Sequence, residues 1–194
     1  MNVQVGVLAL QGAFAAHSDC LTSIGVQSIE VRTPEQLSSV DALMMPGGES
    51  STMSQLLESS GLFDPIAQRI ADGMPVFGTC AGMILLASEI LDGRIDQRSF
   101  SAIDISVRRN AFGRQVDSFE ATINSSVGEF HGVFIRAPRI ERVGDQVEVL
   151  GSINDEPVLV RQGNVLAASF HPELSNDARL HEYFVSITAN KKKV

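Results

Sequence analysis

The chain has 194 residues, of which 44% are hydrophobic and 20% are charged, and its formal net charge is −8. This length and composition are typical of one globular domain with a substantial core. The negative charge argues against a nucleic-acid surface, because phosphate binding needs clustered basic residues and the only such cluster is Lys191–Lys193. We interpret residues 191–194 as a basic tail and residues 1–190 as a single domain.

The two cysteines, Cys20 and Cys80, do not indicate a disulfide framework, so a reducing compartment fits best. Cys20 lies about one helical turn from His17, but without further ligands the pair is better interpreted as a partly exposed helix face than as a metal site. No apolar stretch is long enough to span a bilayer. We therefore expect a cytoplasmic protein that contacts neither membrane nor nucleic acid.

In the first part of the chain, short apolar runs alternate with helical patterns. The run at 3–10 has apolar residues at both odd and even positions, so both faces of a strand formed by it would be apolar. This is typical of a strand buried on both faces of a parallel sheet. A short helix should begin at Pro34, with Thr33 as its N-cap. Further strands are expected at 28–31 and 42–45, and further helices at 13–24, 53–60 and 62–71.

The stretch Pro75–Leu86 joins a buried strand to a helix through a cysteine flanked by glycines. Cys80 lies two residues from Gly78 and two from Gly82, which is the spacing of a nucleophile elbow. At the N-terminus of a helix beginning near Ala81, the sulfur would meet the positive end of the helix dipole, which favours the thiolate. A small buried cysteine under a turn is the alternative. The two glycines favour the nucleophile.

A second glycine pair follows the strand at 42–45, in the segment Pro-Gly-Gly-Glu-Ser-Ser-Thr at 46–52. Glycines in a loop that connects a strand to a helix let backbone N–H groups point into a cleft and bind an oxyanion. A phosphate-binding loop of the Walker type would need a Gly-Lys-Ser/Thr ending, which is missing. The segment is therefore interpreted as an oxyanion loop.

Beyond the elbow helix, expected to end near Asp92–Gly93, the pattern changes to short alternating runs that indicate antiparallel strands. These runs lie at 102–107, 118–123, 132–135, 146–150 and 157–160. A last buried strand at 165–170 precedes a final helix over about 177–189. The pattern predicts a three-layer α/β domain with a mostly parallel sheet and an antiparallel extension.

In open α/β sheets the ligand crevice lies beyond the carboxyl ends of the strands, where segment 46–52, Cys80 and His171 all fall. His171 is placed to exchange a proton with the thiol. Glu173, two residues further on and on the same side of an extended chain, is placed to orient the imidazole. His171 alone could equally cap the end of a strand, but the spacing fixed by Pro172 favours a Cys-His-Glu triad.

The motifs Gly-Thr-Cys-Ala-Gly at 78–82 and His-Pro-Glu at 171–173 resemble those of the triad-type, class I glutamine amidotransferases. The segment at 46–50 resembles their oxyanion loop. Within that superfamily the chain is similar, almost from end to end, to the glutaminase subunits of pyridoxal 5′-phosphate synthase. The stretches that carry this closer resemblance are 6–12, 46–52, 109–119 and 134–138.

The resemblance implies a flavodoxin-like class I glutaminase architecture and hydrolysis of L-glutamine to L-glutamate and ammonia, without metal or cofactor. The ammonia would pass to a separate synthase subunit that builds the vitamin B6 cofactor from a pentose phosphate and a triose phosphate. Cys80, His171 and Glu173 would be catalytic, and the backbone N–H groups of Gly48 and Ala81 would bind the oxyanion. The substrate would be held by Gly48, Glu49, Ser50, Arg109, Ile135 and Arg136.

Other interpretations stay open at this point. The sequence does not decide whether Arg108 or Arg109 faces the ligand. A glutaminase that serves another synthase, or another kind of cysteine hydrolase, is the nearest enzyme alternative, although the latter would not need His-Pro-Glu after a final strand. The alternative without catalysis is an interaction subunit that bears the triad but no longer turns over.

Overall fold

The structure, a computed structural model, describes residues 3–109 and 118–191. The first half contains β1 (Gln4–Leu8), α1 (Phe14–Ser23), β2 (Gln27–Val31), α2 (Pro34–Ser38), β3 (Ala42–Met45), α3 (Ser50–Ser59), α4 (Phe63–Ala71), β4 (Val76–Thr79) and α5 (Ala81–Leu86). The second half contains β5 (Ala87–Ile90), β6 (Ile103–Arg108), β7 (Ser118–Ser125), β8 (Gly128–Ile135), β9 (Arg139–Val143), β10 (Glu148–Ile153), β11 (Glu156–Gln162), β12 (Val165–Ala168), the one-turn helix η1 (Pro172–Leu174) and α6 (Arg179–Lys191).

The main sheet of the described chain has nine strands in the order β2-β1-β3-β4-β12-β11-β10-β7-β8. The strands from β2 to β12 pair in parallel, and those from β12 to β8 pair antiparallel. Ala168 at the end of β12 lies opposite Thr79 at the end of β4. The segments that follow these two strands, which carry His171 and Cys80, therefore emerge side by side at one edge of the sheet.

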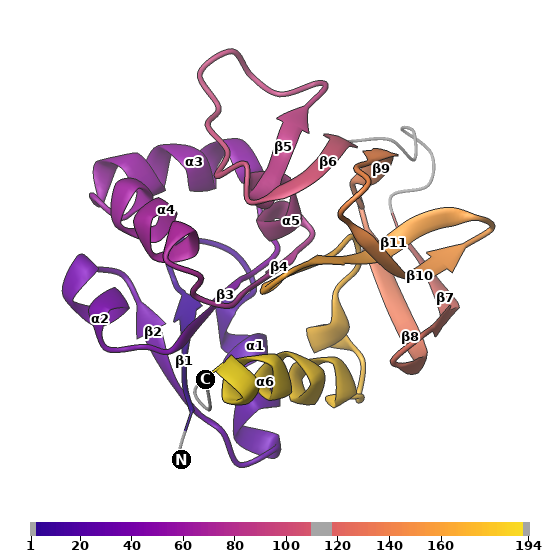
Figure 1. Cartoon of the computed structure of the whole chain (residues 1–194), viewed down its shortest axis with the longest axis horizontal. Coiled ribbons are helices and arrows are strands. Elements are labelled where there is room, and N and C mark those ends of the chain that lie inside the picture. The colour runs from indigo at the N-terminus through magenta and orange to yellow at the C-terminus, as the bar shows by residue number, and fades with distance from the viewer. Residues whose placement is uncertain (1–2, 110–117, 192–194) are drawn as a thin grey trace.

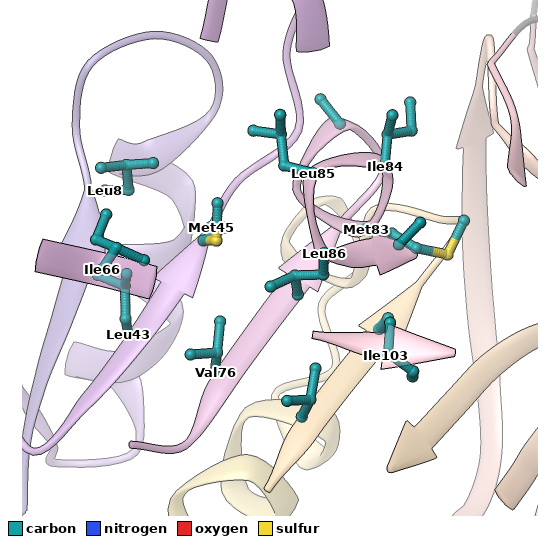
Figure 2. Packing of buried hydrophobic residues seen from close by; sticks show 14 of the residues in the cluster. Leu8, Leu43, Met45, Ile66, Val76, Met83, Ile84, Leu85, Leu86 and Ile103 are labelled. Atoms are coloured by element: carbon teal, nitrogen blue, oxygen red, sulfur yellow. The ribbon is translucent and has the colours of Figure 1, made fainter. Parts of the chain in front are cut away.

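Helices cover both faces of the parallel half of the sheet (Figure 1). Because side chains alternate along a strand, Met44 of β3 packs into the core formed with α1 and α6, and Leu43 and Met45 pack into the core formed with α3, α4 and α5. Figure 2 shows the second core, in which Val76 and Met45 lie near Ile66 of α4 and the side chains of α5. The three-layer α/β prediction is confirmed.

The elbow helix is shorter than predicted. It ends at Leu86, and Ala87, with extended backbone angles, begins β5. Strand β5 pairs in parallel with β6, and β6 pairs with β9, which gives a second, three-stranded sheet. The expectation of a helix reaching Asp92–Gly93 is wrong because the backbone groups of residues 87–90 find partners in β6. Strand β9 was not predicted either.

Two helix boundaries also differ from the predictions. Helix α3 begins at Ser50, three residues before the expected start, because Glu49 acts as its N-cap. Helix α6 begins at Arg179 and includes Lys191, so the expected tail boundary after residue 190 does not coincide with the helix end. Residues 192–194 lie outside the described part of the chain. Within the described part, no helix combines the length and apolar character needed to cross a membrane.

Candidate active site

Cys80 occupies the sharp turn between β4 and α5, with φ 49° and ψ −105°. This backbone conformation is strained for a residue with a side chain, and such strain concentrates at functional sites. The turn is fixed by a hydrogen bond of 2.8 Å from Cys80 N–H to the carbonyl of Ala168 in β12. A Cβ on Gly82 would lie 2.1 Å from the carbonyl oxygen of Met45, so only glycine lets α5 pass so close to β3. The elbow geometry predicted from the glycine spacing is present.

His171 follows β12, and its backbone N–H donates to the carbonyl of Val133 in β8 at 2.8 Å. Its Nδ1 lies 2.7 Å from Glu173 Oε1, and its ring and the Cys80 side chain both lie beside Gly47. Cys80, His171 and Glu173 are 7%, 7% and 6% exposed. The structure therefore brings the three predicted triad residues together in a nearly water-free setting.

Electrostatics of this group favour a charged imidazole. Burial on its own lowers the pKa of His171, but hydrogen bonds to Cys80 and Glu173, together with their negative charges, raise the pKa to about 10. Burial raises the pKa of Glu173, but the hydrogen bond from His171 and the positive charge of His171 hold it below its usual value. At neutral pH His171 is therefore an imidazolium between the Glu173 carboxylate and the Cys80 sulfur.

Gly47 of the oxyanion loop lies directly against the triad. A Cβ on Gly47 would be 2.3 Å from His171 Cε1 and 3.3 Å from Cys80 Cβ. The carbonyl of Gly47 accepts a hydrogen bond from Ala13 N–H at 3.1 Å. Because the C=O and N–H of one trans peptide point in opposite directions, the Gly48 N–H points away from Ala13. This hydrogen bond fixes the orientation of the peptide that was expected to meet an oxyanion.

A cavity of about 350 Å³ opens beside Cys80, which is within the size range of small-molecule sites. It is lined by Gln11, Gly12, Ala13, Gly47, Gly48, Glu49, Ser50, Cys80, Ile84, Arg109, Ile135, Arg136, His171 and Leu174. Every residue expected to hold the substrate is in this set. Glu173 is not in this set and contacts His171 from outside the cavity lining. Ala81 is the first residue of α5, so the N–H of Ala81 has no partner within the helix.

Of the two neighbouring arginines, Arg109 belongs to the cavity lining and Arg108 does not. Arg109 lines the cavity, and its Nη1 donates to Ser51 Oγ at 2.6 Å and to Gln97 Oε1 at 2.7 Å. Arg108 instead pairs with Glu141 at 3.2 Å, away from the cavity lining. Residues 110–117, which belong to the stretch 109–119 that carries part of the family resemblance, lie outside the described residues.

Glu49 combines a helix cap with a place in the cavity wall. Its carboxylate accepts hydrogen bonds from the backbone N–H groups of Ser51 and Thr52 and from the Thr52 hydroxyl. Burial raises the pKa of Glu49, but these hydrogen bonds outweigh it and lower the pKa to about 2. Glu49 Oε1 also lies 3.6 Å from Arg109 Nη2. The cavity wall thus carries fixed charges of both signs.

One prediction about α1 is wrong. His17 was expected on a partly exposed helix face, but it is fully buried, with its Nε2 at 3.4 Å from Glu173 Oε2. Cys20, one turn further on, is only partly buried, with its Sγ 3.9 Å from the carbonyl oxygen of Glu173. In residues 3–109 and 118–191, no group of three or more histidine, cysteine or acidic side chains is arranged to hold a metal ion.

Gln11 and Gln97 also support the site and were assigned no role from the sequence. Gln11 Oε1 accepts a hydrogen bond from Glu49 N–H at 2.9 Å, and Gln97 holds Arg109. Gln11 falls in the stretch 6–12 that carries the family resemblance, which is the only sequence signal for either residue.

The SNO glutamine amidotransferase family matches residues 7–190 of the chain. The chain belongs to this family. Two similar relatives, both called "Pyridoxal 5′-phosphate synthase subunit PdxT", come from Salinispora arenicola and Mycobacteroides abscessus. The first is 56% identical over 94% of this chain and 95% of the relative. The second is 56% identical over 96% and 98%.

Solved structures agree with this SNO family assignment. One described as "Crystal structure of glutamine amidotransferase" is 50% identical, with a TM-score of 0.91 over 95% of this chain and 98% of that chain. The "Structure of PurLQS from Thermotoga maritima" has a TM-score of 0.71 over 96% and 99%, at 13% identity, and supports the fold alone. The predicted fold class and the family resemblance are both confirmed.

Proposed function

We propose that this chain hydrolyses the side-chain amide of L-glutamine and supplies the ammonia to a pyridoxal 5′-phosphate synthase subunit. The observation that carries the proposal is the buried group of Cys80, His171 and Glu173 beside a cavity, in a chain 56% identical to relatives named as subunits of that synthase. We also propose that residues 1–190 act as one amidotransferase domain and that the protein works in the cytoplasm. The family match over residues 7–190 and the two free cysteines support these two points.

The first half of the reaction releases ammonia. The Cys80 thiolate attacks the side-chain carbonyl carbon of glutamine, and the carbonyl oxygen becomes an oxyanion that accepts hydrogen bonds from the N–H groups of Gly48 and Ala81. The carbon–nitrogen bond then breaks while the His171 imidazolium donates its proton to the departing nitrogen. The products of this step are ammonia and a thioester on Cys80.

The second half releases glutamate. Neutral His171 takes a proton from a water molecule, which attacks the thioester carbon. The carbon–sulfur bond breaks, the Cys80 thiolate is restored, and His171 is again protonated. Glu173 keeps the imidazole in one orientation throughout and stabilises its charged form.

The far end of the substrate is an amino acid zwitterion, which needs charges of both signs. Glu49, ionised at neutral pH, is placed to attract the α-ammonium group. Arg109 and Arg136 are placed to bind the α-carboxylate. Ser50 and Ile135 also line the cavity.

The proposal is tested by following nitrogen from glutamine into the cofactor. The chain is mixed with the synthase subunit, its two sugar phosphates and glutamine carrying heavy nitrogen at the amide position. The label should appear in pyridoxal 5′-phosphate, whereas glutamine labelled at the α-nitrogen should give labelled glutamate and unlabelled cofactor. Glutamate release without label in the cofactor would mean that the ammonia serves another synthase, and absence of glutamate would overturn the glutaminase assignment itself.

A further inference from the structure

The carboxylate of Glu173 uses only one of its two oxygens to orient His171. Oε1 accepts the hydrogen bond from His171 Nδ1, while Oε2 meets no partner within hydrogen-bonding criteria among the described residues. The side chain is fully buried. A buried carboxylate oxygen without a donor is costly, because no water replaces the missing hydrogen bond. A basic group, His17 Nε2, lies 3.4 Å from Oε2.

His17 is held in a fixed orientation by residues from distant parts of the chain. Its Nδ1 lies 3.0 Å from Nε2 of His181 in α6, and its Nε2 lies 3.1 Å from the hydroxyl of Thr79. Thr79 directly precedes Cys80. His17 therefore contacts both the acid of the triad and the strand that ends at the nucleophile.

The contacts select one tautomer for each histidine. Burial lowers the pKa of His17 and lowers that of His181 to about 3, so each ring is neutral and carries one N–H. A lone pair on His17 Nε2 would face the carboxylate oxygen of Glu173 and be repelled, so Nε2 carries the proton, which faces Thr79 Oγ1 at 3.1 Å and Glu173 Oε2 at 3.4 Å. His17 Nδ1 then accepts from His181 Nε2–H. The proton-free Nδ1 of His181 is the atom that finds no partner among the described residues.

We propose that His17, oriented by His181, is a positioning residue of the triad, whose Nε2–H faces both Thr79 Oγ1 and Glu173 Oε2 and fixes the carboxylate that orients His171. The inference rests on the proposed glutaminase function. His17 affects the pH dependence of turnover through the ionisation of Glu173. The ionisable side chains around this group are His17 and Cys20 from α1, Cys80 at the start of α5, His171 after β12 and His181 from α6.

The test exploits the different reach of two amides. In His17→Gln the amide nitrogen takes the place of Nε2 and can still donate to Glu173, whereas in His17→Asn it takes the place of Nδ1 and cannot. His17→Leu removes both the contact of Nδ1 with His181 and the contact of Nε2 with Glu173. Phe184→Leu serves as the matched control, because Phe184 is buried in α6 against Phe77 and its side chain carries no titratable or hydrogen-bonding group. Each variant is assayed with the synthase subunit for kcat and KM of glutamine hydrolysis across pH.

We expect His17→Asn and His17→Leu to lose about ten- to hundredfold in kcat, the range seen when a supporting hydrogen bond to a site ligand is removed. KM should change little, because His17 does not line the cavity. The acid limb of the kcat profile should move to higher pH in both variants, because a carboxylate without its donor binds a proton more readily. His17→Gln should retain most of kcat and the wild-type acid limb, as should Phe184→Leu.

Equal kcat values and equal acid limbs in His17→Gln and His17→Asn would overturn the inference, even if His17→Leu fails to fold. An effect confined to KM would also overturn it. The pH dependence of Cys80 alkylation, resolved from Cys20 by peptide mass spectrometry, reports the same shift without turnover. If the wild-type complex hydrolyses no glutamine, the proposed function fails, and the alkylation profile still tests the role of His17.

Discussion

Nδ1 of His171 lies 2.7 Å from Oε1 of Glu173, and both side chains are almost excluded from water. In such a setting each charge depends on the other, because neither has solvent to stabilise it. The pKa of His171 is raised to about 10 although burial alone lowers it. This pair determines how the enzyme responds to pH and to loss of the acid.

Glu173→Gln should keep the fold and lower kcat by about a hundredfold or more, because an amide oxygen can orient His171 but cannot stabilise the imidazolium. Removing the negative charge also lowers the pKa of His171, so the basic limb of the kcat profile should move to lower pH. Steady-state glutamine hydrolysis across pH measures both effects. Unchanged rates over the whole range would remove Glu173 from the triad.

The buried histidine pair should make the fold sensitive to acid. Burial lowers the pKa of His181 from 6.5 to about 3, so between these values the unfolded state binds a proton that the folded state does not. Stability therefore rises with pH in this window, by on the order of 2 kcal/mol between pH 5 and pH 7.5 for His181 alone. Urea unfolding at the two pH values should show a smaller difference in His181→Leu than in the wild type.

Phe184→Leu, a buried substitution in the same helix, provides the control for that measurement. It should leave the pH dependence of the unfolding free energy unchanged, because it removes buried volume but no titratable group. An equal pH dependence in wild type and His181→Leu would show that His181 does not contribute to acid sensitivity.

The two neighbouring arginines provide a matched pair for substrate binding. Arg109→Lys cannot reproduce the fixed guanidinium contacts to Ser51 and Gln97, so KM for glutamine should rise by about tenfold, as expected for loss of a charge-assisted hydrogen bond. Arg108→Lys should leave KM unchanged, because Arg108 pairs with Glu141 outside the cavity lining. Equal effects of the two substitutions on KM would contradict the assignment of Arg109.

Features that depend on local spacing could be predicted from the sequence. Thr33 caps α2, and Cys80 forms an elbow because Gly78 and Gly82 permit the close approach of strand and helix. The end of that helix could not be predicted. Residues 83–86 are apolar on every side, so periodicity does not show where the helix stops, and pairing of β5 with β6 decides it.

Contacts between distant parts of the chain were also beyond sequence reasoning. His17 and His181 are 164 residues apart, and nothing near either of them indicates that they meet behind Glu173. Histidine has only an intermediate tendency to be buried, so the residue type does not predict that His17 is fully buried. Its burial follows only from the packing of α1 and α6 on the same face of the sheet (Figure 1).

The central claim is that Cys80 releases the ammonia that the synthase consumes, and substitution of the two cysteines tests it most directly. Cofactor formation is measured for Cys80→Ala and Cys20→Ala in complex with the synthase subunit, with either glutamine or an ammonium salt as the nitrogen source. We predict that Cys80→Ala forms cofactor from the ammonium salt but not from glutamine, and that Cys20→Ala uses both. Glutamine hydrolysis by Cys80→Ala at the wild-type rate would contradict the account.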